Sequence, residues 1–148
     1  PSVIHQAGEK HLDRLRQKYA SLNVEAKIVP FIDDMITAYA KADLVICRAG
    51  AMTVAEISAV GVASYLVPFP FAVDDHQTSN AKFLADIGAA VLMPQQSFNP
   101  EKLASYLSQI DREELQKMAE QALTLAKPMA TKDVAQICKQ FCKDRAQV

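Results

Sequence analysis

Short apolar runs alternate along the chain with longer segments in which apolar residues recur every three or four positions. The short runs are rich in β-branched residues and predict strands, whereas the longer segments predict amphipathic helices. Strands are predicted over residues 2–6, 26–29, 44–47, 64–67 and 89–92, and helices over 9–20, 33–41, 52–60, 75–86, 100–110, 113–126 and 130–143. This alternation predicts an α/β fold with a parallel sheet.

Two of the predicted strands, over 44–47 and 64–67, are apolar at successive positions rather than at every second one. Strands with that pattern are buried on both faces, because helices cover both sides of a parallel sheet. We therefore expect a Rossmann-like, doubly wound parallel sheet. The last predicted helix carries apolar residues at core spacing, Val134, Ile137, Cys138 and Phe141. We expect these side chains to form an exposed apolar patch where no further domain covers them.

Capping residues mark several helix boundaries. Aspartate pairs at 33–34 and 74–75 stand at the start of two predicted helices, and Asn99 precedes a proline at the first position of another. Gly61 and Gly88 stand where helices are expected to stop. The acidic pair at 33–34 is interpreted as a cap rather than as a catalytic pair of carboxylates.

Composition narrows the class of protein. The chain has 148 residues, of which 50% are apolar and 22% charged, and its formal net charge is −1. These values predict one soluble globular domain and give no sign of a nucleic-acid partner. No apolar run approaches the roughly 20 residues that span a bilayer, and the first residues do not resemble a signal peptide, so we expect a cytoplasmic protein.

The three cysteines, Cys47, Cys138 and Cys142, form no CxxC pair and are not accompanied by clustered histidines. Neither a disulfide framework nor a zinc site is predicted, and reduced thiols are expected.

The segment from Leu44 to Glu56 is the most informative for function. A buried strand leads through the small residues Ala49 and Gly50 into a helix, whose first backbone N–H groups are unpaired and bind anions well. Glu56 follows one turn into the helix, where its carboxylate can accept hydrogen bonds from two ribose hydroxyls. A nucleoside diphosphate fits this arrangement. The same residues equally fit a tight turn followed by a solvated acid that the helix dipole stabilises.

Two further segments place helix starts after strands. Phe31 and Ile32 precede the helix over 33–41, where Phe31 can cover a flat base or simply fill the core. His76 and Gln77 lie in the first turn of the helix over 75–86, and imidazole and amide groups read sugar hydroxyls well. For His76, a capping or surface role is the alternative. No general base with a partner carboxylate stands out.

Taken together, three segments resemble the carboxyl-terminal domain of the MurG family of GT-B glycosyltransferases, which is built from two Rossmann-like domains around a cleft. The resemblance covers nearly the whole chain and rests on the order and spacing of Pro30-Phe31-Ile32-Asp33-Asp34-Met35, Cys47-Arg48-Ala49-Gly50-Ala51-Met52-Thr53-Val54-Ala55-Glu56-Ile57 and Asp75-His76-Gln77-Thr78-Ser79-Asn80-Ala81.

The resemblance implies that this chain is a donor domain that binds UDP-N-acetylglucosamine or UDP. It implies donor contacts by Phe31, Ile32, Arg48, Ala51, Met52, Thr53, Glu56, His76, Gln77 and Asn80. By resemblance, the Ile32 backbone contacts uracil beside Phe31, and Glu56 accepts from the ribose. The amides at 51–53 bind the diphosphate. His76 and Gln77 read the sugar hydroxyls, with Asn80 and Arg48 nearby.

The reaction implied is inverting transfer of N-acetylglucosamine to lipid I, which forms lipid II in peptidoglycan synthesis. Lipid I and the general base belong to the other domain, so no catalytic residue is expected in this chain, and the chain alone is expected to be inactive. No metal or other cofactor is expected, and neither is a transmembrane segment. The full-length protein is expected to be peripheral on the cytoplasmic face of the inner membrane, with roles in cell shape and division.

The sequence departs from the family pattern in two places. The Gly-Gly-Ser-type loop of the family is absent, so residues 1–148 are expected to form a donor-binding domain that lacks its first strand and glycine-rich loop. Many family members have Gln where this chain has His76. Two other functions fit the residues: a UDP-N-acetylglucosamine 2-epimerase-like isomerase, and a stand-alone nucleotide-sugar-binding module.

Overall fold

The structure is a computed structural model that describes residues 1–145; for Val73 and for residues 143–145 only the backbone is described. The chain divides into two compact units, Pro1–Ala38 and Tyr39–Val148, and each is described by itself.

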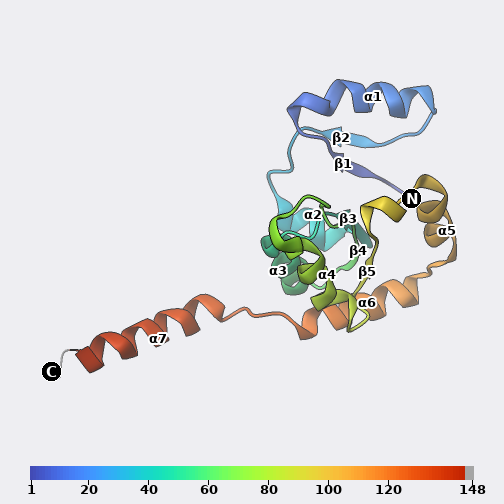
Figure 1. Cartoon of the computed structure of the whole chain (residues 1–148). Helices are drawn as coiled ribbons and strands as arrows, with labels where there is room; N and C mark the ends of the chain where they lie inside the picture. Colours follow the sequence, from blue (N-terminus) through green and yellow to red (C-terminus); the bar gives the residue numbers. More distant parts are fainter. Residues whose placement is uncertain (146–148) are drawn as a thin grey trace. The chain divides into compact units, whose positions relative to one another are not determined.

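The first unit is a β-α-β element (Figure 1). Strands β1 (Ile4–Gln6) and β2 (Lys27–Val29) pair in parallel. The 3₁₀ turn η1 (Glu9–His11) and helix α1 (Leu12–Ser21) connect them. Within this unit, the Tyr19 hydroxyl lies 3.1 Å from His5 Nδ1, which links α1 to β1.

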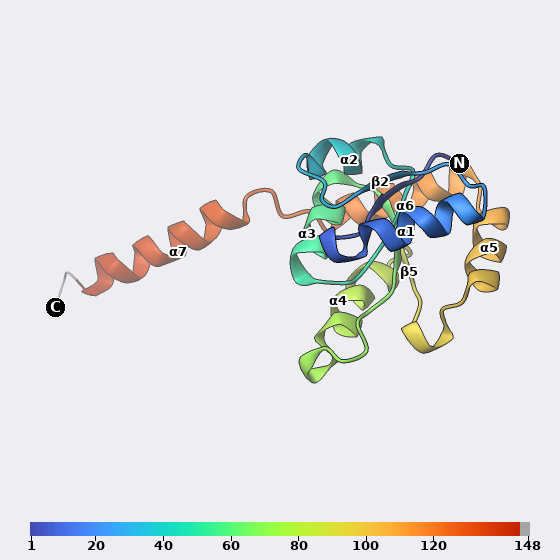
Figure 2. The same ribbon diagram turned by 90° about the horizontal axis from the view of Figure 1, so that it is seen from above.

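The second unit is built around a three-stranded parallel sheet in the order β3-β4-β5. Its strands are β3 (Leu44–Cys47), β4 (Ala63–Leu66) and β5 (Ala90–Leu92). Helix α3 (Ala51–Val60) joins the first two strands and α4 (His76–Ala85) joins the last two, and the two helices lie side by side (Figure 2). All four residues of β4 are buried, as expected for a central parallel strand.

Both faces of this sheet are covered. Tyr65 and Leu66 are successive residues of β4, so their side chains point to opposite faces, and both are buried. On the Tyr65 face, its ring lies 5.1 Å from the ring of Tyr106 in α5 (Pro100–Gln109). Helix α6 (Arg112–Thr124) packs against β4 and α3.

The remaining elements are α2 (Met35–Lys41), the 3₁₀ turns η2 (Val73–Asp75) and η3 (Gln95–Ser97), and α7 (Ala130–Arg145). Tyr39 is the buried residue of α2, whereas Ile36 of the same helix is exposed. The apolar stripe predicted on the last helix is confirmed as exposed. Val134 is 60%, Ile137 52% and Phe141 69% accessible to solvent.

The predicted α/β architecture with parallel strands is confirmed, and the element bounds differ from the predicted ones by one or two residues at most ends. Two predicted caps are also confirmed, because Asp34 Oδ1 accepts from Thr37 N and Asn99 Oδ1 accepts from Lys102 N. The cap predicted at Asp75 is different. Its carboxylate accepts from the Thr78 hydroxyl at 2.7 Å and makes no hydrogen bond to a backbone N–H of α4.

Within residues 1–145, no helix is both long and apolar enough to cross a membrane.

Gly61 ends α3 in a left-handed conformation with φ of +71°, and its N–H donates to the Ile57 carbonyl at 2.9 Å. A Cβ at this position would overlap the Leu123 side chain of α6. We expect Gly61→Ala to lower the free energy of unfolding by about 2–4 kcal/mol, because it combines left-handed strain with overpacking. Urea unfolding at equilibrium measures this change.

Gly88→Ala is the matched control. Gly88 has a similar φ of +75°, but a Cβ there meets no atom within 4 Å. It should therefore show only the backbone strain, about 1 kcal/mol. Equal losses in the two variants would contradict the close packing of α3 on α6.

Cys47 differs from the other two cysteines, because burial raises the pKa of its thiol to about 12, whereas Cys138 and Cys142 are exposed. Only the thiolate reacts rapidly with alkylating reagents, so the Cys47 thiol should react slowly with them below pH 12. With a maleimide at pH 8, we expect Cys47 to react roughly a hundred-fold or more slowly than Cys142. Mass spectrometry of timed samples gives the rates, and rapid labelling of Cys47 in the folded chain would contradict its burial.

Candidate functional site

The turn between β3 and α3 places a helix start at the carboxyl edge of the three-stranded sheet. Gly50 is the cap residue and has no side chain to pair with the first amides, and the first helical bond runs from Val54 N to Gly50 O at 3.0 Å. The N–H groups of residues 51–53 precede that bond and have no carbonyl partner within the helix. They can donate to an anion, as predicted for Ala51, Met52 and Thr53.

Helix α4 begins at the same edge, because it follows the next strand of the parallel sheet. Asn80 Nδ2 donates to the Ala49 carbonyl oxygen at 3.1 Å, which links α4 directly to the turn that precedes α3. This bond joins two of the three segments that sequence analysis singled out. It also fixes the Asn80 amide, whose Oδ1 remains as an acceptor.

Arg48 holds the loop that follows β4. Its Nη1 donates to the carbonyl oxygens of Val67 at 3.1 Å and Pro68 at 3.0 Å, and its guanidinium lies 5.5 Å from the centre of the Phe69 ring. These contacts explain why an arginine follows β3, since its planar fork can both stack and donate. The donor contact predicted for Arg48 stays a prediction, and the structure adds a supporting role that sequence analysis missed.

Gln77 is fixed by the same loop. Its Oε1 accepts from Phe69 N at 2.9 Å, so the amide directs its Nε2 donors elsewhere. His76, the first residue of α4, is exposed beside it. The start of α4 thus presents amide donors from Gln77 and an acceptor from Asn80, which is the combination that a sugar hydroxyl needs.

Glu56 lies on α3 with its side chain exposed, and its carboxylate has a partner that sequence analysis missed. The Tyr39 hydroxyl donates to Glu56 Oε2 at 3.3 Å. The pKa of Tyr39 is raised to about 12, mainly by burial and secondly by the nearby charge of Glu56. The phenol therefore stays protonated and able to donate. A tyrosine at a buried helix position was the available signal, since a buried hydroxyl usually requires a partner.

Phe31 and Ile32 belong to the first unit. Phe31 is 64% exposed, which excludes the interpretation of its ring as core within this unit. The Ile32 N–H, predicted to read a base, donates to Gln6 Oε1 at 2.9 Å. A base that takes this N–H must displace the exposed Gln6 side chain, an obstacle that sequence analysis did not foresee.

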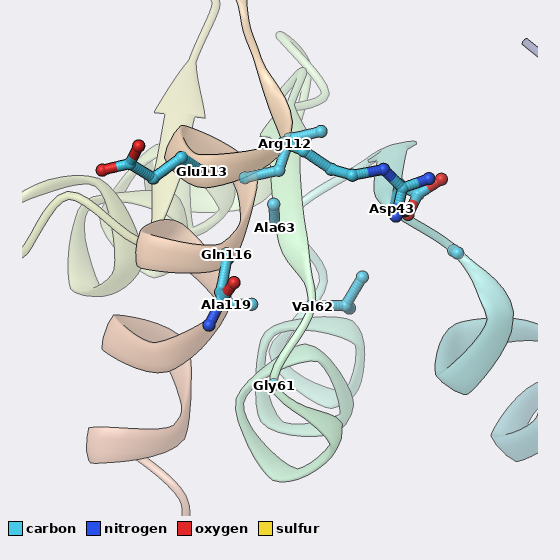
Figure 3. A pocket seen from close by; sticks show the side chains of 10 residues that line it. Asp43, Gly61, Val62, Ala63, Arg112, Glu113, Gln116 and Ala119 are labelled. Carbon is cyan, nitrogen blue, oxygen red and sulfur yellow. Dashed lines mark ion pairs between the residues drawn. The ribbon is translucent and has the colours of Figure 1, made fainter.

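A hollow of about 390 Å³ lies in the second unit, at the amino end of β4. It is lined by Val62 and Ala63 and by the start of α6 (Figure 3). Arg112 reaches across it to Asp43, with 3.2 Å between Nη1 and Oδ1. None of the predicted site residues lines it.

Among the side chains that the structure describes, no group of three or more from His, Cys, Asp and Glu is placed to hold a metal ion.

Comparison with known proteins identifies the family. The glycosyltransferase family 28 C-terminal domain matches residues 2–140. Two similar relatives come from Azoarcus sp. (strain BH72), 59% identical over 98% of this chain, and Paraburkholderia phytofirmans, 58% identical over 93%. Both bear the name UDP-N-acetylglucosamine--N-acetylmuramyl-(pentapeptide) pyrophosphoryl-undecaprenol N-acetylglucosamine transferase. The chain spans only 41% and 38% of their lengths.

Solved structures agree with this assignment. The crystal structure of Acinetobacter baumannii MurG superimposes with a TM-score of 0.88 at 44% identity, covering 94% of this chain and 43% of that one. The glycosyltransferase VinC, solved in complex with dTDP, superimposes with a TM-score of 0.62 at 17% identity and supports the fold alone; the match covers 84% of this chain and 37% of that one. The resemblance to the carboxyl-terminal domain of MurG is therefore confirmed, and the chain belongs to the glycosyltransferase family 28 C-terminal domain family.

Proposed function

We propose that this chain binds UDP-N-acetylglucosamine and is the donor-binding part of an inverting glycosyltransferase. The observation that carries the proposal is the hydrogen bond from Asn80 to the Ala49 carbonyl. It holds the start of α3, which suits phosphates, beside the start of α4, which suits a sugar.

The diphosphate binds at the start of α3. The amides of Ala51, Met52 and Thr53 donate to its oxygens, and the positive end of the helix dipole offsets part of its charge. Glu56 lies further along the same helix and accepts from the two ribose hydroxyls. The order of these groups along one helix, amides first and carboxylate second, matches the order of phosphate and ribose in a nucleotide.

The sugar binds at the start of α4. Gln77 supplies donors and Asn80 an acceptor, because each amide has its other end engaged by the backbone. His76 and Arg48 complete the proposed sugar contacts. Phe31 and the Ile32 backbone bind the uracil once Gln6 releases the Ile32 N–H.

The proposed reaction is direct displacement. A hydroxyl of lipid I attacks the anomeric carbon, the bond from that carbon to the phosphate oxygen breaks, and UDP leaves with the electron pair. The start of α3 stabilises the charge that develops on the leaving phosphate, without a metal. The base that takes the hydroxyl proton and the lipid I site lie in the remainder of the full-length protein, so the chain alone binds donor without turning it over.

The relatives' names support a proposal for the biological setting. Those relatives are N-acetylglucosamine transferases acting on an undecaprenol-linked acceptor. We propose the same acceptor here, a place in peptidoglycan synthesis, and action at the cytoplasmic face of the membrane, with consequences for cell shape and division. The relatives' names support a transferase over an epimerase or a stand-alone binding module.

Calorimetric titration of the chain with UDP-N-acetylglucosamine, UDP-glucose and UDP tests donor binding. We expect saturable binding with preference for the N-acetylglucosamine donor. Glu56→Ala should weaken UDP binding roughly ten- to a hundred-fold, because hydrogen bonds to a carboxylate are strong.

Glu120→Ala is the control for this test. Glu120 is an exposed helical glutamate of α6 that accepts from Gln116. Its replacement should leave UDP binding unchanged. If the folded wild-type chain binds none of the three nucleotides, or if both glutamate variants weaken binding alike, the proposed donor site is wrong.

A further inference from the structure

We propose that Tyr39 is a positioning residue of the donor site, whose hydroxyl holds the Glu56 carboxylate in the orientation that accepts the ribose hydroxyls. This inference rests on the proposed donor-binding function.

The first observation is the placement of Tyr39. It is the buried residue of α2, only 7% exposed, and its hydroxyl donates to Glu56 Oε2 at 3.3 Å. A buried ring on a short helix has little freedom to move, so the hydroxyl presents a fixed donor. A leucine or phenylalanine would fill the same space without that donor.

The second observation concerns Glu56 itself. It is an exposed side chain on the surface of α3, and glutamate has several rotatable bonds, so without a partner it populates many rotamers. The Tyr39 hydroxyl is the hydrogen-bond donor that the structure gives this carboxylate. The conformational entropy of ordering Glu56 is therefore lost on folding rather than on binding.

The third point is the number of hydrogen bonds that the Glu56 carboxylate can accept. An ionised carboxylate has two oxygens and about four acceptor positions. Tyr39 occupies one position on Oε2, which leaves Oε1 and the second position of Oε2 for two ribose hydroxyls. The two roles are compatible, because the phenol donates and the ribose hydroxyls also donate.

The phenol keeps this role over a wide pH range. Burial and the adjacent carboxylate raise the pKa of Tyr39 to about 12, so it does not become an anion that would repel Glu56.

The test is Tyr39→Phe in the 148-residue chain, with UDP and 2′,3′-dideoxy-UDP as the titrants. We expect the variant to bind UDP about five- to ten-fold more weakly, the effect of losing one modest hydrogen bond that orders a binding group. Affinity for the dideoxy nucleotide should not change, because that ligand makes no use of Glu56. General damage to the fold would lower the affinity for both ligands.

Tyr106→Phe is the matched control. Tyr106 is also a packed tyrosine of the second unit, but its hydroxyl donates to Met118 Sδ at 3.7 Å rather than to a carboxylate. Its replacement should leave both affinities unchanged. In the Glu56→Ala background, Tyr39→Phe should add no further loss for UDP, because the group that Tyr39 positions is gone.

Each outcome is decisive. Equal UDP affinity in Tyr39→Phe and wild type overturns the positioning role while donor binding stands. Equal losses for UDP and the dideoxy nucleotide also overturn it, since the effect then does not pass through the ribose. Absence of UDP binding in the wild-type chain overturns the proposed function, and this inference with it.

Discussion

The hydrogen bond from Asn80 to the Ala49 carbonyl oxygen is the contact on which the geometry of the candidate site depends. Parallel strands bring their carboxyl ends to one edge, so α3 and α4 start near each other by topology alone. Topology alone does not fix the distance between the two helix starts as closely as a hydrogen bond does. Asn80 does so by reaching from the second turn of α4 to the turn before α3. In the proposed donor complex a nucleotide sugar spans both starts, so its fit depends on that spacing.

A second set of contacts fixes the loop between β4 and α4. Arg48 donates to two carbonyl oxygens at the end of β4, and Gln77 accepts from Phe69 N. Both side chains belong to segments that were singled out for ligand contact, and both make protein contacts as well. When one side chain both orders a loop and contacts a ligand, its replacement removes both interactions at once. If Arg48 makes the proposed donor contact, its replacement removes both that contact and the hydrogen bonds that order the loop.

The sequence predicts the elements well because their signals are local. Apolar runs, glycine stops and the caps at Asp34 and Asn99 act over a few residues, and the structure contains them where expected. The grouping of residues 48–56 with 76–80 also follows from parallel topology. What the sequence could not provide is which polar atoms pair.

The missed pairs share a physical cause. Gln6 accepts from Ile32 N across 26 residues, and Tyr39 donates to Glu56 across 17. Such bonds depend on side-chain rotamers and on the distance between elements, and periodicity encodes neither. The cap at Asp75 was predicted from residue type alone, and the left-handed backbone at this position redirects its carboxylate to Thr78.

That left-handed backbone restricts which residues can occupy the loop. Asp74 and Asp75 have φ values of +50° and +51°, a conformation that Asp, Asn and Gly tolerate and that β-branched residues resist. Few residue types are therefore compatible with these two positions at the start of α4, although both side chains are exposed. The backbone conformation at the start of α4 therefore restricts substitution at these two positions, whatever their side chains contact.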